Sequence, residues 1–168
     1  MSKAGLEVAV KYGEKLNEFN SMADAESYFF EYKDSLLSRF ENICTDSKFN
    51  ADYSVDSLKT LEKWYFELWE KDDFASFAVS RAEFEEMLTV YFDEVAVRNI
   101  DEAQWEVMAY PFVNGKYELG LKCGLMNLAG LGHFRDLCTM QGNKRRNFIS
   151  REYKKYFDTY LQYMQDQK

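Results

Sequence analysis

Few side chains in this sequence have the types and spacing that metal-dependent catalysis requires. The chain has one histidine, His133, and three cysteines, Cys44, Cys123 and Cys138. A di-iron carboxylate bundle needs two Glu-x-x-His pairs, and a His-Glu-x-x-His zinc hydrolase needs two histidines, so both classes are excluded. A zinc set of Cys123, His133 and Cys138 lacks a fourth ligand at a diagnostic spacing. We therefore expect no metal and no cofactor.

The common nucleophile and phosphate-binding motifs are also missing. The sequence contains no Gly-x-Ser-x-Gly elbow and no P-loop. Gly130-Leu-Gly132 begins like a dinucleotide fingerprint, but Arg135 occupies the third glycine position. His133 and Cys138 are five residues apart, which would place them on different faces of one helix. These gaps favour a non-catalytic protein over an enzyme, and no catalytic residue is assigned.

A basic cluster near the C-terminus is the first candidate binding site. Six basic side chains fall between residues 144 and 155, opposed only by Glu152: Lys144, Arg145, Arg146, Arg151, Lys154 and Lys155. The first three precede a predicted helix, whose N-terminal N–H groups favour anions. The cluster could bind a phosphate, a carboxylate or an acidic partner, or it could simply offset acidic residues of the same chain, which we favour.

Trp64 and Trp69 form the second candidate site. They lie on a predicted helix, residues 55–71, whose apolar surface extends over most of its circumference. A helix of this kind is usually central in a fold. The alternative is an exposed binding face, through which the chain could also form homo-oligomers.

Charge and composition limit the kinds of partner. The net charge is −8, and the two parts of the chain differ: residues 1–100 carry 21 acidic and 11 basic side chains, whereas residues 101–168 carry 8 and 10. An acidic chain argues against general nucleic-acid binding. We find no signal-peptide core and no stretch of about 18 uncharged apolar residues, so we expect no membrane segment. Three widely spaced cysteines are typical of buried thiols in a reducing compartment, so we expect the cytoplasm.

Hydrophobic periodicity predicts several helices in the first hundred residues. The expected ranges are 4–19, 22–44, 55–71 and about 80–99. Ser21 and Ser54 are the expected N-caps of the second and third helices. Ser80 and Glu83 form a capping box for the fourth, which carries a buried stripe of Phe84, Leu88, Tyr91, Phe92 and Val95.

The period then changes from 3.6 to 2, which predicts a β-hairpin. Residues 105–112 and 117–123 flank Asn114-Gly115, a strong turn signal. A two-residue turn would pair Phe112 with Tyr117, Tyr110 with Leu119 and Met108 with Leu121, all on one face. Pro111 would then fall at a hydrogen-bonded position without an N–H to donate. Either the ladder breaks there or the turn is longer, and the first strand is expected to be an edge strand.

Two more elements complete the predicted fold. Residues 125–128 could form a third strand or lead into a helix, and we favour a short helix over 128–141. The clearest signal is a last helix over 148–165. We therefore predict one helix-rich α+β domain over residues 1–168, with five or six helices packed on an antiparallel hairpin or small meander.

One segment resembles a known group of proteins. The segment predicts the end of a helix, with a Glu94–Arg98 pair, just before the hairpin. It reads Tyr91-Phe-Asp-Glu-Val-Ala-Val-Arg-Asn-Ile and is followed by Trp105. Over residues 84–123 it resembles bacterial helix-then-hairpin proteins of unknown function, some of them encoded near toxin systems. Those proteins have glycine where this chain has Asp93. The resemblance implies no catalytic residue.

These observations favour a bacterial protein-interaction module of immunity or inhibitor type. It would bind another protein, such as a toxin or a basic partner, through the acidic, aromatic-rich first half. The alternative is a small anionic-ligand-binding domain or enzyme, with a site between the hairpin and the last helix that uses Arg145, Arg146 or Arg151.

Overall fold

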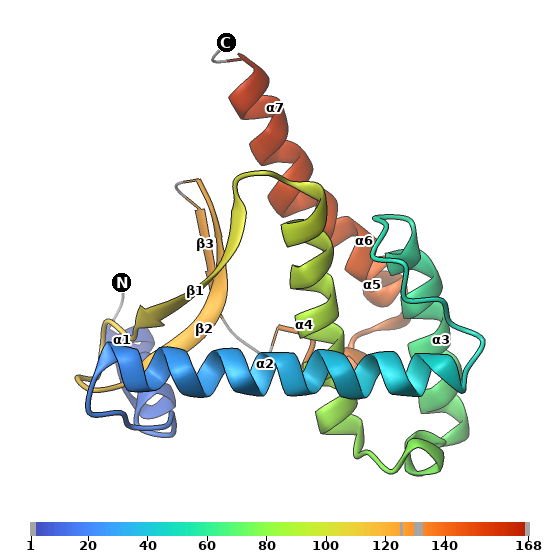
Figure 1. Cartoon of the computed structure of the whole chain (residues 1–168), viewed down its shortest axis with the longest axis horizontal. Coiled ribbons are helices and arrows are strands. Elements are labelled where there is room, and N and C mark those ends of the chain that lie inside the picture. The colour runs from blue at the N-terminus through green and yellow to red at the C-terminus, as the bar shows by residue number, and fades with distance from the viewer. Residues whose placement is uncertain (1–2, 125, 130–132, 167–168) are drawn as a thin grey trace. The chain divides into compact units, whose positions relative to one another are not determined.

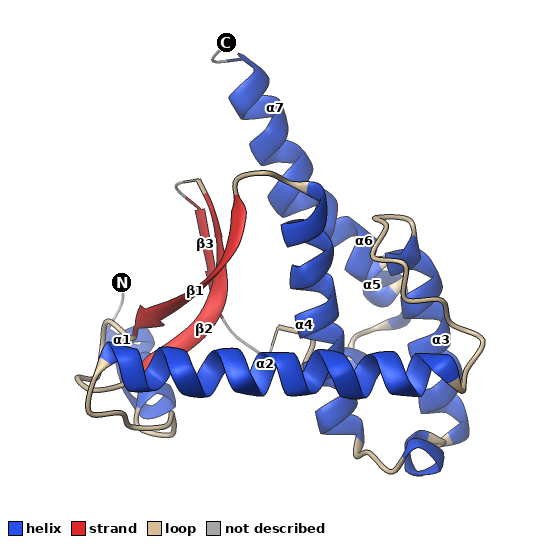
Figure 2. Cartoon of the chain, viewed as in Figure 1, coloured by secondary structure: helices blue, strands red, loops and turns tan. Residues whose placement is uncertain are grey.

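The computed structural model of the chain describes residues 3–124, 126–129 and 133–166. The fold is α+β and mostly helical, with a three-stranded antiparallel sheet (Figures 1 and 2), which confirms the predicted fold class. The chain forms two compact units, Met1–Ser35 with Glu102–Leu131, and Leu36–Asp101 with Gly132–Lys168. Each is described by itself, and the expectation of a single domain over residues 1–168 stays a prediction.

The first unit combines helix α1 (Lys3–Gly13), the start of α2 (Met22–Thr45) and the sheet. Helix α1 is shorter than predicted, because the chain turns after Gly13 and Glu18 forms a β-bridge with Lys116. Gly13 is so close to Tyr110 that an added Cβ would lie 2.4 Å from the tyrosine ring. The predicted cap of α2 is confirmed, since the Ser21 hydroxyl accepts the Asp24 N–H at 3.1 Å.

The hairpin is present, but the predicted register is wrong. Strand β1 (Ala103–Ala109) pairs with β2 (Tyr117–Cys123) so that Ala109 lies opposite Tyr117 and Val107 opposite Leu119. The connection is longer than two residues and leaves Pro111 outside the ladder, as the missing N–H requires. The register therefore differs by three residues, and an odd shift exchanges the inner and outer faces of β1. Strand β1 is an edge of the sheet, as predicted.

The helix predicted over 128–141 is not formed in the part of that range that the structure describes. Strand β3 (Met126–Ala129) instead extends the sheet in the order β1-β2-β3. A turn over residues 133–136 then leads to a single 3₁₀ turn, η2 (Leu137–Thr139). Residues 125 and 130–132 of that prediction lie outside the described residues. Glycine at positions 130 and 132 disfavours a helix over this range, because each costs about 1 kcal/mol relative to alanine in a helix.

The core of the first unit lies between α2 and one face of the sheet. Ala25 and Phe29 pack on Val107 and Leu119, with Trp105 and Tyr117 partly buried at the margin. The β2 half of the predicted inner face is therefore right. The β1 half is wrong, because Trp105 and Val107 take the places opposite Leu121 and Leu119 that were expected for Met108 and Tyr110.

The second unit contains the remaining helices. They are the rest of α2, α3 (Ser57–Lys71), the 3₁₀ turn η1 (Phe74–Phe77), α4 (Arg81–Asn99), α5 (Gly142–Arg145) and α6 (Phe148–Tyr153), which continues through a π-helical turn, η3 (Lys154–Asp158), into α7 (Thr159–Asp166). The capping box of Ser80 and Glu83 is confirmed. The predicted last helix is confirmed as one helical run over α6, η3 and α7.

The aromatic residues of the first half mostly fill the core of this second unit. Phe40, Phe84 and Tyr91 are fully buried. The Phe40 ring lies 5.1 Å from that of Tyr91 and 6.1 Å from that of Phe84. Phe49 and Trp64 stack beside them at 5.3 Å. The high aromatic content thus largely supplies packing between α2, α3 and α4, and by itself it does not indicate a binding surface.

Candidate binding groove

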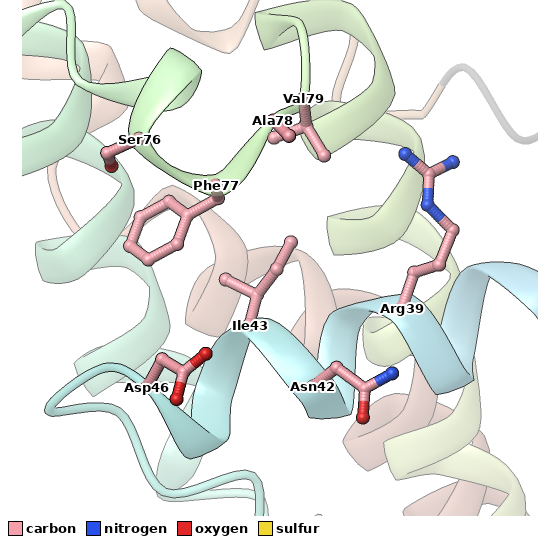
Figure 3. Close-up of a pocket in the computed structure, with 8 residues that line it drawn as sticks. All are labelled: Arg39, Asn42, Ile43, Asp46, Ser76, Phe77, Ala78 and Val79. Atoms are coloured by element: carbon pink, nitrogen blue, oxygen red, sulfur yellow. The ribbon is translucent and has the colours of Figure 1, made fainter.

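An open groove lies between the end of α2 and the segment from η1 to the start of α4. It is open to solvent, has a volume of about 620 Å³, and is lined by Arg39, Asn42, Ile43, Asp46, Ser76, Phe77, Ala78 and Val79. Figure 3 shows Ile43 and Phe77 facing each other across it, one from each wall. Its size falls in the range of ligand sites in proteins. The groove lies entirely within the second unit.

The spacing on α2 and a cap on η1 give the groove its shape. Arg39, Asn42 and Ile43 recur at helical spacing, so they share one face of α2, and Asp46 follows in the turn directly after the helix ends at Thr45. Opposite them, Ala78 ends η1 in a left-handed conformation (φ 55°), which reverses the chain and turns Val79 inward. Val79 is buried, whereas Phe77 is only half-buried.

The charges around the groove do not cancel. The Arg39 guanidinium lies 3.3 Å from the Glu83 carboxylate, so these two groups neutralise each other. Asp46, in the turn directly after α2, is exposed. The groove therefore has an apolar floor of Ile43 and Phe77 and one surplus negative charge at its rim.

Sequence reasoning did not find this groove. Most of its residues on the α2 side are polar, and the others come from the connection between α3 and α4, and neither segment has a motif. A usable signal was the presence of two phenylalanines, Phe74 and Phe77, in the short connection between α3 and α4. Phe74 is buried at 4% exposure and anchors the connection, which leaves Phe77 to face the groove.

The two tryptophans predicted as a binding surface have different surroundings. Trp64 is half-buried and its ring lies 6.0 Å from that of Phe77, edge-on at 78°, so it supports the groove from behind. Trp69 lies five residues further along α3 and contacts the Arg145 guanidinium at 5.4 Å. Five residues turn a helix by roughly 140°, so the two rings face different neighbours.

The predicted basic cluster is partly engaged within the unit. The Arg145 guanidinium lies 5.0 Å from the Phe66 ring and also over Trp69, and Arg151 donates to the backbone oxygen of Lys144. Lys144 and Arg146 are exposed. The structure therefore brings Arg145 and Trp69 together, but separates both from Trp64.

The N-terminus of α6, the expected anion site, already holds a carboxylate. Glu62 on α3 is buried at 6% exposure and accepts the Ile149 N–H at 2.8 Å. Burial raises the pKa of Glu62, while the backbone N–H groups of residues 147–149 and Arg151 oppose that rise. An internal carboxylate thus satisfies the helix end that would otherwise attract an external anion.

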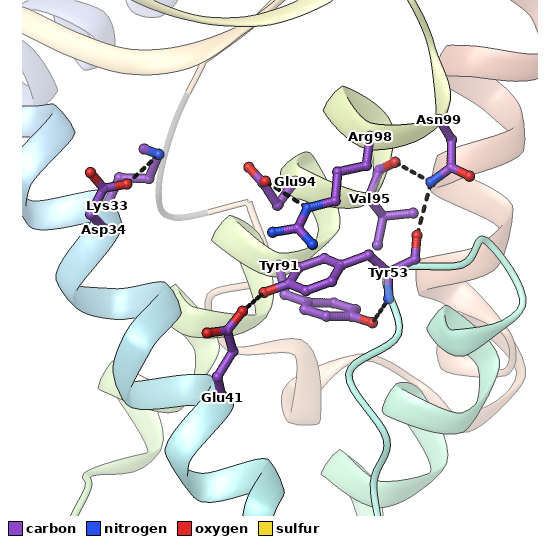
Figure 4. A network of polar contacts seen from close by, with 9 residues as sticks. All are labelled: Lys33, Asp34, Glu41, Tyr53, Tyr91, Glu94, Val95, Arg98 and Asn99. Atoms are coloured by element: carbon purple, nitrogen blue, oxygen red, sulfur yellow. Dashed lines mark hydrogen bonds and ion pairs between the residues drawn. The ribbon is translucent and has the colours of Figure 1, made fainter.

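A polar network joins the loop before α3 to helix α4 (Figure 4). Tyr53 has a left-handed backbone (φ 57°), and the Arg98 guanidinium lies 3.5 Å from its ring centroid. Asn99 donates to the Tyr53 carbonyl oxygen at 2.8 Å, and the Tyr91 hydroxyl accepts the Tyr53 N–H at 3.1 Å. Burial, followed by the hydrogen bond to Glu41, raises the pKa of the Tyr53 hydroxyl. The Glu94–Arg98 pair is confirmed at 2.9 Å.

A second polar network ties the turn at residues 133–139 to α3 and α4. The Glu85 carboxylate, 2% exposed, accepts the Tyr65 hydroxyl at 2.6 Å and the Asp136 N–H at 3.1 Å. Arg81 bridges Glu85 and Asp136, at 3.6 and 3.2 Å. These groups satisfy one another, which is typical of a structural network rather than of a site awaiting a ligand.

His133 and the cysteines lie in apolar surroundings. The His133 ring lies parallel to that of Phe92 at 5.9 Å, and burial lowers its pKa although Glu152 is 3.7 Å away. The three thiols are buried and free, as predicted, and burial raises the pKa of Cys44 to about 12.

Among the described residues, no three His, Cys, Asp or Glu side chains gather in a way that could hold a metal ion. None of the described helices is both long and apolar enough to cross a bilayer.

Comparison with known proteins identifies the family. The family model described as "Uncharacterised protein YwmA" matches residues 18–157, which include the groove, both strands of the hairpin and the basic cluster. "Uncharacterized protein YwmA" of Bacillus subtilis (strain 168) is 29% identical over 112 residues, covering 67% of this chain and 71% of that protein. No solved structure matches. The family match also includes residues 84–123, on which the sequence resemblance depended. The chain therefore belongs to the YwmA family of uncharacterised proteins.

Proposed function

We propose that this chain is a non-catalytic protein-interaction module of immunity or inhibitor type, and that its partner is basic. The observation that carries the proposal is the open groove at residues 39–46 and 76–79, with its apolar floor and surplus negative charge. An open, mixed surface suits a segment of another protein better than a small substrate, which is usually enclosed.

The charge distribution supports a basic partner. The first hundred residues carry a surplus of ten acidic side chains, 21 against 11. On the first part of α2, Asp24, Glu26, Glu31 and Asp34 are all exposed. Surplus surface charge of one sign accelerates association with an oppositely charged partner and makes the rate sensitive to salt.

The test is isolation of the partner from the organism that encodes the chain. The tagged chain is used for capture at low salt, the partner is identified and produced separately, and the association rate is measured at rising salt. We expect a stable complex whose association slows by at least about tenfold between about 0.05 and 0.5 M salt. For an immunity function, the partner alone should inhibit growth, and co-expression of this chain should restore it.

Two results would contradict the proposal. One is the recovery of no partner at low salt. The other is a complex whose association rate does not change with salt, which would mean that surplus acidic charge plays no part in recognition. A gene for a toxin beside the gene for this chain would decide in favour of the immunity type.

The second candidate function is binding of an anionic ligand at the basic cluster. The observation in its favour is that Lys144 and Arg146 are exposed next to the half-buried Arg145. A thermal-shift series with phosphate and carboxylate metabolites tests it. A stabilisation that is lost in the double variant Lys144→Gln, Arg146→Gln would support this function, and no stabilisation by any compound would remove it.

A further inference from the structure

We infer that the groove between α2 and η1 receives a cationic side chain, arginine or lysine, presented by a partner protein. The inference rests on the proposed function and specifies the chemistry of the partner at one site. It is carried by three features of the groove lining: an aromatic and aliphatic floor, one surplus carboxylate, and two further hydrogen-bond acceptors.

The floor fits the stem of a long basic side chain. Ile43 is 8% exposed and Phe77 half-buried, so both already lie against protein and leave one apolar surface toward the groove. Arginine and lysine bury their methylene groups on such surfaces and keep the charged end in water. The Phe77 ring, backed by Trp64 at 6.0 Å, is also placed to attract a cation to its free face.

The charges select a cation rather than an anion. Arg39 is engaged by Glu83 at 3.3 Å, so its charge is offset before any ligand arrives. Asp46 lines the same groove from the turn that directly follows α2. An anion in the groove would be repelled by Asp46, and a purely apolar ligand would remove that carboxylate from water without compensation.

Two other polar side chains that line the groove, Ser76 and Asn42, can accept further hydrogen bonds. The Ser76 hydroxyl donates to the Asp73 carbonyl at 2.8 Å, which leaves its oxygen lone pairs as acceptors. The Asn42 amide oxygen is a second acceptor on the α2 wall of the groove (Figure 3). A guanidinium has five donors and an ammonium has three, so both can use several acceptors at once. The volume of about 620 Å³ also leaves room for backbone beside the inserted side chain.

The experiment is a titration of the ¹⁵N-labelled full chain with two capped peptides, followed by NMR chemical shifts. The peptides are acetyl-Ala-Leu-Arg-Leu-Ala-amide and the same peptide with glutamine in place of arginine. We expect shifts concentrated in residues 39–46 and 76–79, and a dissociation constant about two- to fivefold lower for the arginine peptide. Asp46→Asn should remove this preference, and Phe77→Ala should weaken binding of the arginine peptide by at least about twofold.

The matched control is Asp101→Asn, which makes the same charge change at an exposed residue beyond the far end of α4. It should keep the preference for arginine. Equal affinity for both peptides, retention of the preference in Asp46→Asn, shifts elsewhere in the chain, or no binding up to about 10 mM would each overturn the inference. If a salt-dependent partner complex forms while these peptides fail, the groove assignment falls and the proposed function stands. If no partner is recovered, the proposed function falls whatever the peptides do.

Discussion

At the level of single residues, the best-defined interactions hold the loop at Tyr53 against helix α4. Tyr53 has a positive φ of 57°, which is rare for a bulky side chain, so neighbouring groups must stabilise it. Arg98 and Asn99, two residues of the segment on which the bacterial resemblance depended, contact its ring and its carbonyl oxygen. That segment thus has a structural role within this unit.

The hydroxyl of Tyr91 should make a measurable contribution to this loop. It accepts the buried Tyr53 N–H and lies 2.8 Å from the Ser57 hydroxyl. Tyr91→Phe leaves that N–H without its acceptor, so we expect the free energy of unfolding to fall by about 1–2 kcal/mol in urea denaturation. Tyr28→Phe, at a side chain that is 42% exposed, is the control and should change it by less than about 0.5 kcal/mol. Equal effects of the two substitutions would contradict this assignment.

Asp93 should make stability depend on pH. It occupies the position where the resembling proteins have glycine, it is 8% exposed, and burial raises its pKa well above the usual value. The folded state holds the proton of this carboxyl more tightly than the unfolded chain does. The stability that Asp93 contributes is therefore complete below the ordinary pKa of aspartate, and it is lost as the pH rises through the pKa of Asp93 in the folded state. Asp93→Asn has no carboxyl to ionise. We therefore expect the variant to gain stability relative to the original chain as pH rises from 4 to 7, measured by urea denaturation at several pH values. A gap that is constant with pH would count against this explanation.

At the level of elements, proline chemistry and turn length decided the arrangement of the hairpin. Asn114-Gly115 indicated a turn, and Gly115 does have a positive φ of 72°. The strands nevertheless end at Ala109 and begin again at Tyr117, because Pro111 cannot donate to the ladder. The outcome is that Leu119 is 2% exposed whereas Phe112, expected on the same inner face, is 39% exposed.

This difference in burial gives a direct test of the register. Leu119→Ala removes a side chain packed on Ala25, Phe29 and Val107, and should lower the free energy of unfolding by about 2–4 kcal/mol. Phe112→Ala removes a larger but exposed ring and should cost less than about 1 kcal/mol. Thermal and urea unfolding of both variants measure the two values. A larger loss for Phe112→Ala would favour the two-residue turn instead.

At the level of the whole molecule, the central question is whether the two compact units unfold together. Helix α2 (Met22–Thr45) is continuous across the boundary between Ser35 and Leu36, so melting one unit should disrupt half of a helix that the other unit needs. We therefore expect a single cooperative transition. In a Trp64→Phe, Trp69→Phe variant the remaining tryptophan, Trp105, reports the first unit, while Trp105→Phe leaves reporters in the second. Coincident fluorescence and circular dichroism transitions are expected, and transitions at separate urea concentrations would show two independent units.

The amino-acid sequence by itself determined the local structure. Helical periodicity placed α2, α3, α4 and the last helical run, and the capping box of Ser80 and Glu83 placed the start of α4. The change to a period of 2 placed β1 and β2. All of these signals depend on residues that are close together in the chain. Tertiary structure decided the register of the hairpin, the use of Glu62 to satisfy α6, and the groove at Ile43 and Phe77. Each of these depends on contacts between residues that are far apart in the sequence, such as the hydrogen bond between Glu62 and Ile149 at 2.8 Å. The residue pattern around Glu62, or around Ile149, does not by itself show that the two segments meet.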